Sequence, residues 1–180
     1  TASHNPSGYN GIKFCFSEAR PVSSDTGIDE IRDEVFSKIA TGDGSGSISQ
    51  LNLLGEFANH VKSFVDTDKL KPLRVVADTA NGMGGLVVPA VFQDLPFQIE
   101  IMYQDLDGTF PNHPADPIQP ENLADLQKRV VETNADIGLA FDGDADRVFL
   151  VDEKAQPVSG SVTTALVAKK VLNEEPGATI

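Results

Sequence analysis

The sequence predicts an α/β fold with a mixed, mostly parallel sheet flanked by helices. Short apolar runs alternate with longer amphipathic stretches over residues 73–172. Each apolar run has the length of a strand, and the stretches between the runs repeat their apolar residues at helical spacing. Strands that alternate with helices in this way are typical of layered α/β architectures.

The expected elements follow one another along the chain. Residues 11–17 are expected to form a strand, and residues 25–40 and 53–65 are expected to form helices. The stretch TGDGSGSIS at residues 41–49 is the strongest linker signal and marks the expected domain boundary. Further strands are expected at 73–78, 97–103, 136–141 and 148–151, and further helices at 86–92, 121–133 and 163–172.

Composition indicates which classes of partner the protein does not bind and in which cellular compartment it is expected. A net charge of −13 over 180 residues argues against binding to nucleic acid or to an anionic membrane surface. No apolar run approaches the length of a membrane span. The single cysteine, Cys15, suits a reducing cytoplasm and is expected in the core, among Ile12, Phe14 and Phe16.

The segment DGDADR at residues 142–147 predicts a metal site. It places Asp142, Asp144 and Asp146 at alternate positions directly after an apolar strand, where their carboxylates can converge on one hard divalent cation. A calcium-binding EF-hand loop is excluded because Arg147 stands where that motif needs glycine, and because the flanks read as strands. A solvated surface turn is the simpler alternative, but three like charges repel one another unless a positive group lies among them.

A second acidic segment, DLDGT at residues 105–109, matches the nucleophile motif of haloacid-dehalogenase-like phosphatases. In that interpretation Asp105 is phosphorylated and Asp107 acts as acid and base. A proline-rich loop, FPNHPADP, follows where that family continues with a helix or a cap. A strand-ending turn built on Asp-Gly chemistry is therefore the competing interpretation.

Two further features, the turn DTANGMGG and His113, have no assigned catalytic role. The turn DTANGMGG lacks the third glycine of a dinucleotide-binding loop, because Val87 stands in its place. Its glycines are expected to allow close packing of strand and helix. His113 either approaches a site or orders its own loop, and the sequence does not decide between these roles.

The opening segment, TASHNPSGYNGIKF, can supply the chemistry that a metal loop needs. A serine hydroxyl is a poor nucleophile unless it is assisted, but a phosphorylated Ser3 would be a phosphoryl donor with nearly two negative charges. Such a group would bind the metal held by the three aspartates, and Arg147 could contact its remaining oxygens. Lys13 could act as a charge partner or as a proton carrier.

These two segments resemble the phosphoserine loop and the metal loop of the α-D-phosphohexomutase family, most closely its bacterial phosphomannomutase/phosphoglucomutase members. The segments DTANGMGG, LDGTFPNHPADPIQPENL and NADIGLAFDGDADRVFLVD are also similar to the family's second domain, in the same order. The resemblance covers nearly the whole chain, and it disfavours the dehalogenase interpretation because the family shows a similar DG-x-FPNH loop.

The resemblance implies a site and a reaction. Ser3 would carry the phosphoryl group, Arg147 would contact it, and His4 and Lys13 would serve as acid, base or charge-stabilising groups. The enzyme would interconvert hexose 1-phosphate and hexose 6-phosphate of mannose or glucose through a bisphosphorylated sugar, with glucose 1,6-bisphosphate as activator. The implied ligands of Mg²⁺ are the phosphorylated Ser3, Asp142, Asp144 and Asp146.

The resemblance also implies a division of the chain. Residues 1–48 would be the C-terminal part of a first domain, residues 49–156 a second domain, and residues 157–180 the start of a third. The family's sugar-recognition loops have no counterpart in the sequence, so the chain is expected to be a fragment that is inactive alone. A non-catalytic metal-binding module is the alternative. Residues 11–17 are expected to form an exposed edge strand through which the chain either self-associates or which it leaves disordered.

Overall fold

The computed structural model describes residues 3, 5–38 and 44–180. It divides the chain into two compact units. The smaller unit holds residues 10–52, and the larger unit joins the start of the chain, up to Tyr9, to residues 53–180. The larger unit contains Ser3, the three aspartates and Arg147, and the smaller unit contains Lys13.

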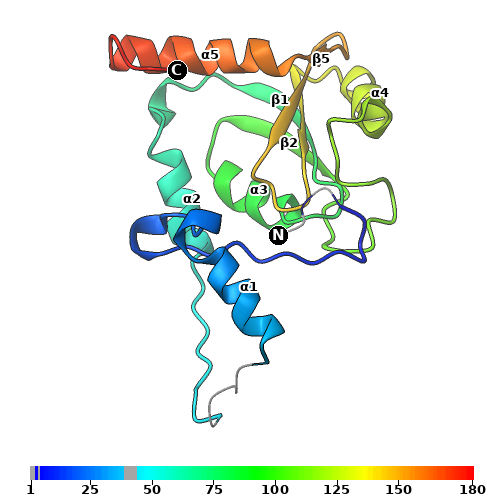
Figure 1. Cartoon of the computed structure of the whole chain (residues 1–180). Coiled ribbons are helices and arrows are strands. Elements are labelled where there is room, and N and C mark those ends of the chain that lie inside the picture. The colour runs from blue at the N-terminus through cyan, green and yellow to red at the C-terminus, as the bar shows by residue number, and fades with distance from the viewer. Residues whose placement is uncertain (1–2, 4, 39–43) are drawn as a thin grey trace. The chain divides into compact units, whose positions relative to one another are not determined.

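A five-stranded sheet in the order β2-β1-β3-β4-β5 forms the centre of the larger unit (Figure 1). β1 pairs in parallel with both β2 and β3, whereas β4 runs antiparallel to β3 and to β5. This mixed sheet confirms the predicted fold class. The strands are β1 (Leu73–Asp78), β2 (Phe97–Met102), β3 (Ile137–Phe141), β4 (Val148–Asp152) and β5 (Pro157–Val158).

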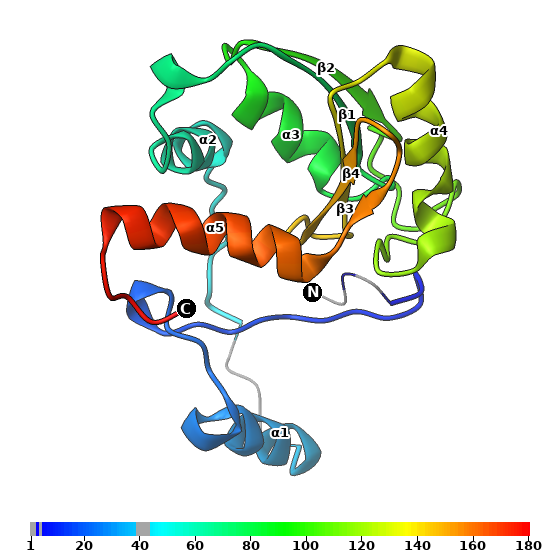
Figure 2. The same ribbon diagram turned by 90° about the horizontal axis from the view of Figure 1, so that it is seen from above.

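Helices cover both faces of this sheet. α2 and α3 pack against each other on one face, and α4 contacts β1 and β3 on the other (Figure 2). α5 follows directly after β5, and α4 begins after a short 3₁₀ turn at Pro120–Leu123. The helices of the larger unit are α2 (Leu54–Lys62), α3 (Gly84–Phe92), α4 (Ala124–Thr133) and α5 (Gly160–Glu174).

The core lies between the sheet and α4. Leu126 and Val130 are one helical turn apart, so they share the inner face of α4, and both are fully buried. They join Val76 of β1, Ala140 of β3 and Val151 of β4 in one apolar cluster. Burying a large aliphatic side chain stabilises a fold by about 1.5–3 kcal/mol, so this cluster holds α4 against the strands whose ends carry the acidic residues.

The smaller unit departs from the sequence prediction. Residues 11–17 form no strand: Cys15 makes only an isolated antiparallel bridge with Pro21, and it is exposed instead of buried. The prediction was wrong because an apolar run becomes a strand only where neighbouring strands pair with it, and this unit offers a single bridge within its described residues. Ile12 and Phe14 are exposed as well.

Other boundaries are close to those expected. The helix predicted at residues 25–40 is α1 (Ile28–Phe36), which follows a 3₁₀ turn at Ser24–Thr26. Residues 39–43, the predicted end of that helix and the start of the linker, lie outside the described residues. The strand β5 was not predicted, and it consists of two residues only. In the part of the chain that is described, no helix has both the length and the apolar character needed to cross a membrane.

Candidate active site

The candidate site lies at one edge of the sheet. β1, β2 and β3 are parallel, so their carboxyl ends meet at the same edge. Asp78 closes β1 and Asp142 follows β3, and both side chains are buried there. In open α/β sheets, ligands bind in the crevice outside the carboxyl ends of the strands.

The loop predicted to bind a metal, residues 142–147 and called the metal loop from here on, is the connection between β3 and β4. Phe141 pairs with Val148, and the six residues between them form a tight turn in which the Ala145 N–H donates to the Asp142 carbonyl at 3.1 Å. Ala145 adopts a left-handed φ of 59°. The turn brings one carboxylate oxygen from each aspartate within 4.8 Å of the others; the three are Asp142, Asp144 and Asp146. Three convergent carboxylates are a donor set that fits a hard divalent cation.

Ser3 contacts this loop directly. Its Oγ donates to Asp142 Oδ2 at 3.0 Å and accepts from Arg147 Nη2 at 3.0 Å. A main-chain hydrogen bond also holds Ser3 against the loop, because the Gly143 N–H donates to the Ser3 carbonyl at 3.0 Å. The structure therefore brings together Ser3, Asp142 and Arg147, which lie up to 144 positions apart in the sequence.

Arg147 neutralises the buried end of the acidic loop. Its Nε and Nη2 lie 2.8 and 2.7 Å from Asp142 Oδ2, and the Asp142 side chain is fully buried. Partial burial alone would lower the pKa of the guanidinium, but the hydrogen bond to Asp142 and the charges of the three aspartates outweigh it and raise the pKa. Arg147 is thus a permanent cation beside the Ser3 hydroxyl, where a phosphoryl group would carry its negative charge.

The remaining two predicted residues have a different status. His4 lies outside the described residues. Lys13 belongs to the smaller unit and is exposed there. Their roles as acid, base or charge-stabilising groups stay predictions.

A buried ion pair beside the site was not predicted as such. His113 Nε2 lies 2.9 Å from Asp78 Oδ2, and Nδ1 lies 2.9 Å from the Pro114 carbonyl. Both partners are acceptors, so both bonds form together only when the ring is protonated. Tyr103 packs edge-on against this ring and donates to Asp125 Oδ2 at 2.7 Å. His113 therefore orders its own loop and also joins that loop to Asp78 at the carboxyl edge of the sheet, so both roles that the sequence left open stay predictions.

Protonation of His113 should make stability depend on pH. Burial lowers the pKa of this imidazole, but the hydrogen bond and charge of Asp78, the Pro114 carbonyl and the charge of Asp125 raise it above its usual 6.5. A raised folded-state pKa means that the stabilisation is complete below about pH 6.5 and is lost as pH rises through the folded pKa. We expect His113→Gln to lower the free energy of unfolding by about 1.5–3 kcal/mol at pH 6, and by less at higher pH.

Chemical denaturation of both proteins between pH 6 and pH 9 measures this difference. His60→Gln is the matched control, because His60 is an exposed histidine on α2. A difference that grows with pH would contradict the protonated pair.

The DLDGT segment forms a turn. Asp107 Oδ1 accepts hydrogen bonds from the backbone N–H of Thr109 at 2.9 Å and from its hydroxyl at 2.7 Å. These bonds lower the pKa of the exposed Asp107 carboxyl, which opposes the role of a proton donor near neutral pH. The geometry fits the strand-ending turn that competed with the phosphatase interpretation.

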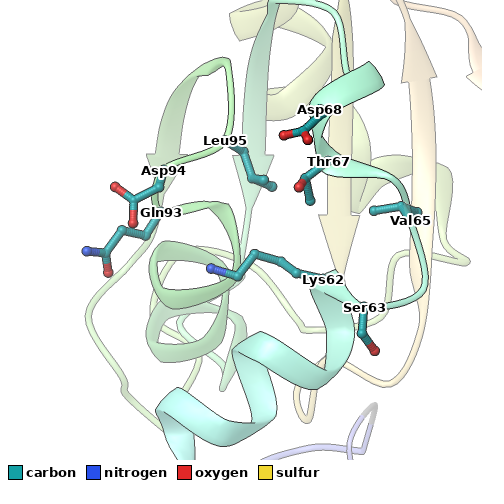
Figure 3. Close-up of a pocket in the computed structure, with 8 residues that line it drawn as sticks. All are labelled: Lys62, Ser63, Val65, Thr67, Asp68, Gln93, Asp94 and Leu95. Atoms are coloured by element: carbon teal, nitrogen blue, oxygen red, sulfur yellow. The ribbon is translucent and has the colours of Figure 1, made fainter.

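Two of the cavities among the described residues flank the sheet at different places. One, of about 600 Å³, opens beside the Ser3 loop, and Asn5, Pro6 and Phe110 are among its lining residues. The other, of about 480 Å³, lies between the end of α2 and the turn that precedes β2 (Figure 3). Lys62, Asp68 and Asp94 border it without forming a convergent set of catalytic groups. Among the described residues, the candidate catalytic and metal-binding groups Ser3, Arg147 and the three aspartates lie at the carboxyl ends of the parallel strands.

Comparison with known proteins identifies the family. Residues 55–156 match the model for phosphoglucomutase/phosphomannomutase, alpha/beta/alpha domain II, and residues 1–41 match the model for alpha/beta/alpha domain I. The first match alone covers more than half of the chain. The chain belongs to the phosphoglucomutase/phosphomannomutase family. The resemblance inferred from the sequence is thereby confirmed.

Individual members of the phosphoglucomutase/phosphomannomutase family are similar in sequence to nearly the whole chain. The chain is 39% identical over 178 residues to a protein named phosphohexose mutases from Xanthomonas campestris, matching 98% of this chain and 40% of that protein. It is 37% identical to phosphomannomutase/phosphoglucomutase from Pseudomonas aeruginosa, matching 100% of this chain and 38% of that protein. The chain thus spans about 40% of the length of the curated relatives that it matches.

A solved structure supports the fold of this family as well. A phosphoglucomutase/phosphomannomutase family protein from Burkholderia thailandensis superposes with a TM-score of 0.84 at 33% identity, over 99% of this chain and 38% of that one. Membership in the phosphoglucomutase/phosphomannomutase family leaves the haloacid-dehalogenase alternative unsupported, in agreement with the turn geometry of Asp107.

Proposed function

We propose that this chain carries the phosphoryl-donor site and the metal site of a phosphohexomutase. The complete protein would interconvert the 1-phosphate and 6-phosphate of mannose or glucose through a bisphosphorylated sugar. The observation that carries the proposal is the contact of the Ser3 hydroxyl with both Asp142 and Arg147, at 3.0 Å each. The relatives named phosphomannomutase and phosphoglucomutase support the substrate class.

The proposed reaction is a phosphoryl transfer from Ser3. The bond between phosphorus and Ser3 Oγ breaks, and a bond to a sugar hydroxyl oxygen forms. The proton of that hydroxyl passes to a base, a role proposed for His4 or Lys13, and Ser3 Oγ takes up a proton to re-form its hydroxyl. The second phosphate of the bisphosphorylated sugar then returns to Ser3. Arg147, fixed by Asp142, would hold the charged oxygens in position, because this kind of reaction depends mainly on positioning and charge stabilisation.

Asp142, Asp144 and Asp146 would hold Mg²⁺ together with the Ser3 phosphate. When bound, a divalent cation neutralises phosphate charge and polarises the phosphorus–oxygen bond. Glucose 1,6-bisphosphate is the proposed activator, since it can phosphorylate Ser3.

Loss of the serine hydroxyl should abolish phosphorylation. We expect the chain to gain one phosphoryl group on Ser3 when it is incubated with glucose 1,6-bisphosphate and Mg²⁺, and Ser3→Ala to gain none. Intact-mass spectrometry followed by peptide mapping measures both results. Ser63→Ala is the matched control, because Ser63 caps the C-terminal end of α2 beside another cavity (Figure 3) and its hydroxyl donates to the His60 carbonyl of that helix at 2.7 Å.

The other outcomes distinguish the alternatives. A hydroxylamine-sensitive phosphate on Asp105 would support a phosphatase of the dehalogenase type. A chain that binds Mg²⁺ and gains no phosphate would support a non-catalytic metal-binding module. Either result would overturn the proposed donor role of Ser3.

Several wider expectations belong to the same proposal. The division into residues 1–48, 49–156 and 157–180 and a location in the cytoplasm stay predictions, as does the expectation that the protein binds neither nucleic acid nor membranes. Self-association also stays a prediction, although residues 11–17 form no strand to mediate it. Light scattering over a range of concentrations measures the oligomeric state directly.

A further inference from the structure

The Asn-Gly turn, residues 79–83, lies directly behind the metal loop. A Cβ added to Gly82 would lie 2.6 Å from the Gly143 carbonyl oxygen and 2.9 Å from the Gly143 Cα. The Met83 N–H donates to that same carbonyl at 2.9 Å. Only glycine lets the two backbones approach so closely, because any other side chain would push on main-chain atoms that belong to the metal loop.

Gly143 connects this turn to Ser3. Its carbonyl accepts from Met83, and its N–H donates to the Ser3 carbonyl at 3.0 Å. A Cβ at Gly143 would in turn collide with the Ser3 carbonyl oxygen. Three segments from distant parts of the sequence are therefore stacked backbone to backbone, with the metal loop in the middle.

Asn81 anchors the turn from the other side. Its backbone N–H donates to the Tyr103 carbonyl at 3.0 Å, and its carbonyl accepts from the Asp107 N–H at 2.9 Å. Its side-chain amide donates to the Asp105 carbonyl at 2.8 Å and accepts from Asn112 at 2.7 Å. All four hydrogen-bonding groups of Asn81 are thus used, and the residue is buried with a left-handed φ of 59°, which asparagine tolerates better than most residues.

We propose that Asn81 and Gly82 are positioning residues for the metal loop: the close contact of Gly82 with Gly143 sets where Asp142 and Asp144 stand relative to Ser3. The inference rests on the proposed metal site. Asn81 ties the turn to residues 103–112, and Gly82 transmits that fixed position to the loop by direct backbone contact. The turn, which lacks the third glycine of a dinucleotide-binding loop, would therefore act on the proposed phosphoryl transfer through its backbone contacts with the metal loop.

The test compares two glycines of the same turn region. Gly82→Ala pushes on Gly143, whereas the atoms nearest to a Cβ at Gly84 belong to the side chains of Thr79, at 3.1 Å, and Phe141, at 3.6 Å. Both variants are expected to lower the melting temperature. Only Gly82→Ala is expected to weaken Mn²⁺ binding, by roughly 10–100-fold in calorimetric titration, as for other residues that orient metal ligands. Equal weakening in both variants, or none in Gly82→Ala, would overturn the proposal.

A second measurement is independent of metal. Amide hydrogen exchange of the metal-free proteins reports the hydrogen bond between Gly143 and Ser3, and its rate at Gly143 should rise roughly fivefold in Gly82→Ala but not in Gly84→Ala. If the wild-type chain binds no Mn²⁺ while this difference persists, the proposed metal function fails and the positioning role stands. An unchanged exchange rate at Gly143 overturns the positioning role.

A milder variant covers the case in which Gly82→Ala does not fold. Asn81→Gly keeps the left-handed backbone and adds no clash, but it removes the two side-chain bonds to Asp105 and Asn112. Its Mn²⁺ affinity and the exchange rate at Gly143 should change in the same directions by smaller factors. Wild-type values for both would overturn the role of Asn81.

Discussion

Replacing Asp142 with asparagine is expected to weaken Mg²⁺ binding by about 100-fold or more and to abolish phosphorylation of Ser3. Asp142 is the buried member of the three carboxylates, and it also accepts hydrogen bonds from the Ser3 hydroxyl and the Arg147 guanidinium. Two unit charges 4 Å apart interact by about 4 kcal/mol near a protein surface, and about 1.4 kcal/mol corresponds to a tenfold change in affinity. Removing one charge from the ligand set therefore has a large effect. Isothermal titration calorimetry with Mg²⁺ measures it.

The control for this variant removes the charge of an aspartate outside the candidate site. Asp94 is exposed at the opposite edge of the sheet and has a left-handed φ of 65°, a conformation that asparagine adopts readily. Asp94→Asn should bind Mg²⁺ as the wild type does. If the two variants lost affinity equally, the effect would come from overall charge, and the convergent site would be contradicted.

Truncating Leu126 to alanine is expected to lower the free energy of unfolding by about 3–4 kcal/mol, in the middle of the range for buried leucines. Leu126 is fully buried in the cluster between α4 and the sheet. Its removal leaves a cavity against Val76 and Ala140, which lie near the carboxyl ends of β1 and β3. The loss should be seen as a lower denaturation midpoint in urea.

Val131 provides the comparison on the same helix. It is 59% exposed, and alanine has the higher helix propensity, so Val131→Ala should change the free energy of unfolding by less than about 0.5 kcal/mol. Similar losses in both variants would show that α4 does not pack against the sheet through its Leu126 face. Mg²⁺ affinity of folded Leu126→Ala should stay near the wild-type value, because the buried cluster that holds Leu126 consists of residues outside the metal loop.

The candidate site was predictable from the sequence where local spacing carries the chemistry. Three aspartates at alternate positions after an apolar strand indicate a cation site without knowledge of any distant contact. The pairing of His113 with Asp78 had no such signal, because the two residues are 35 positions apart and lie in two separate segments of the sequence. The role of Gly82 was hidden for the same reason: the sequence explained its glycine by strand–helix packing, whereas its closest neighbour is Gly143.

The sequence by itself determined the α/β class, most element boundaries of the larger unit, the family resemblance and the residues of the metal loop. These features depend on periodicity and on local motifs, which a chain carries within short windows. Tertiary structure alone decided that residues 11–17 form no strand and that Cys15 is exposed. It also shows the direct contacts of the Ser3 hydroxyl with Asp142 and Arg147, where the sequence had implied only that these groups share one site. A strand needs a partner, burial needs a covering surface, and a site needs groups from distant segments, so each of these depends on contacts that no short window of sequence contains.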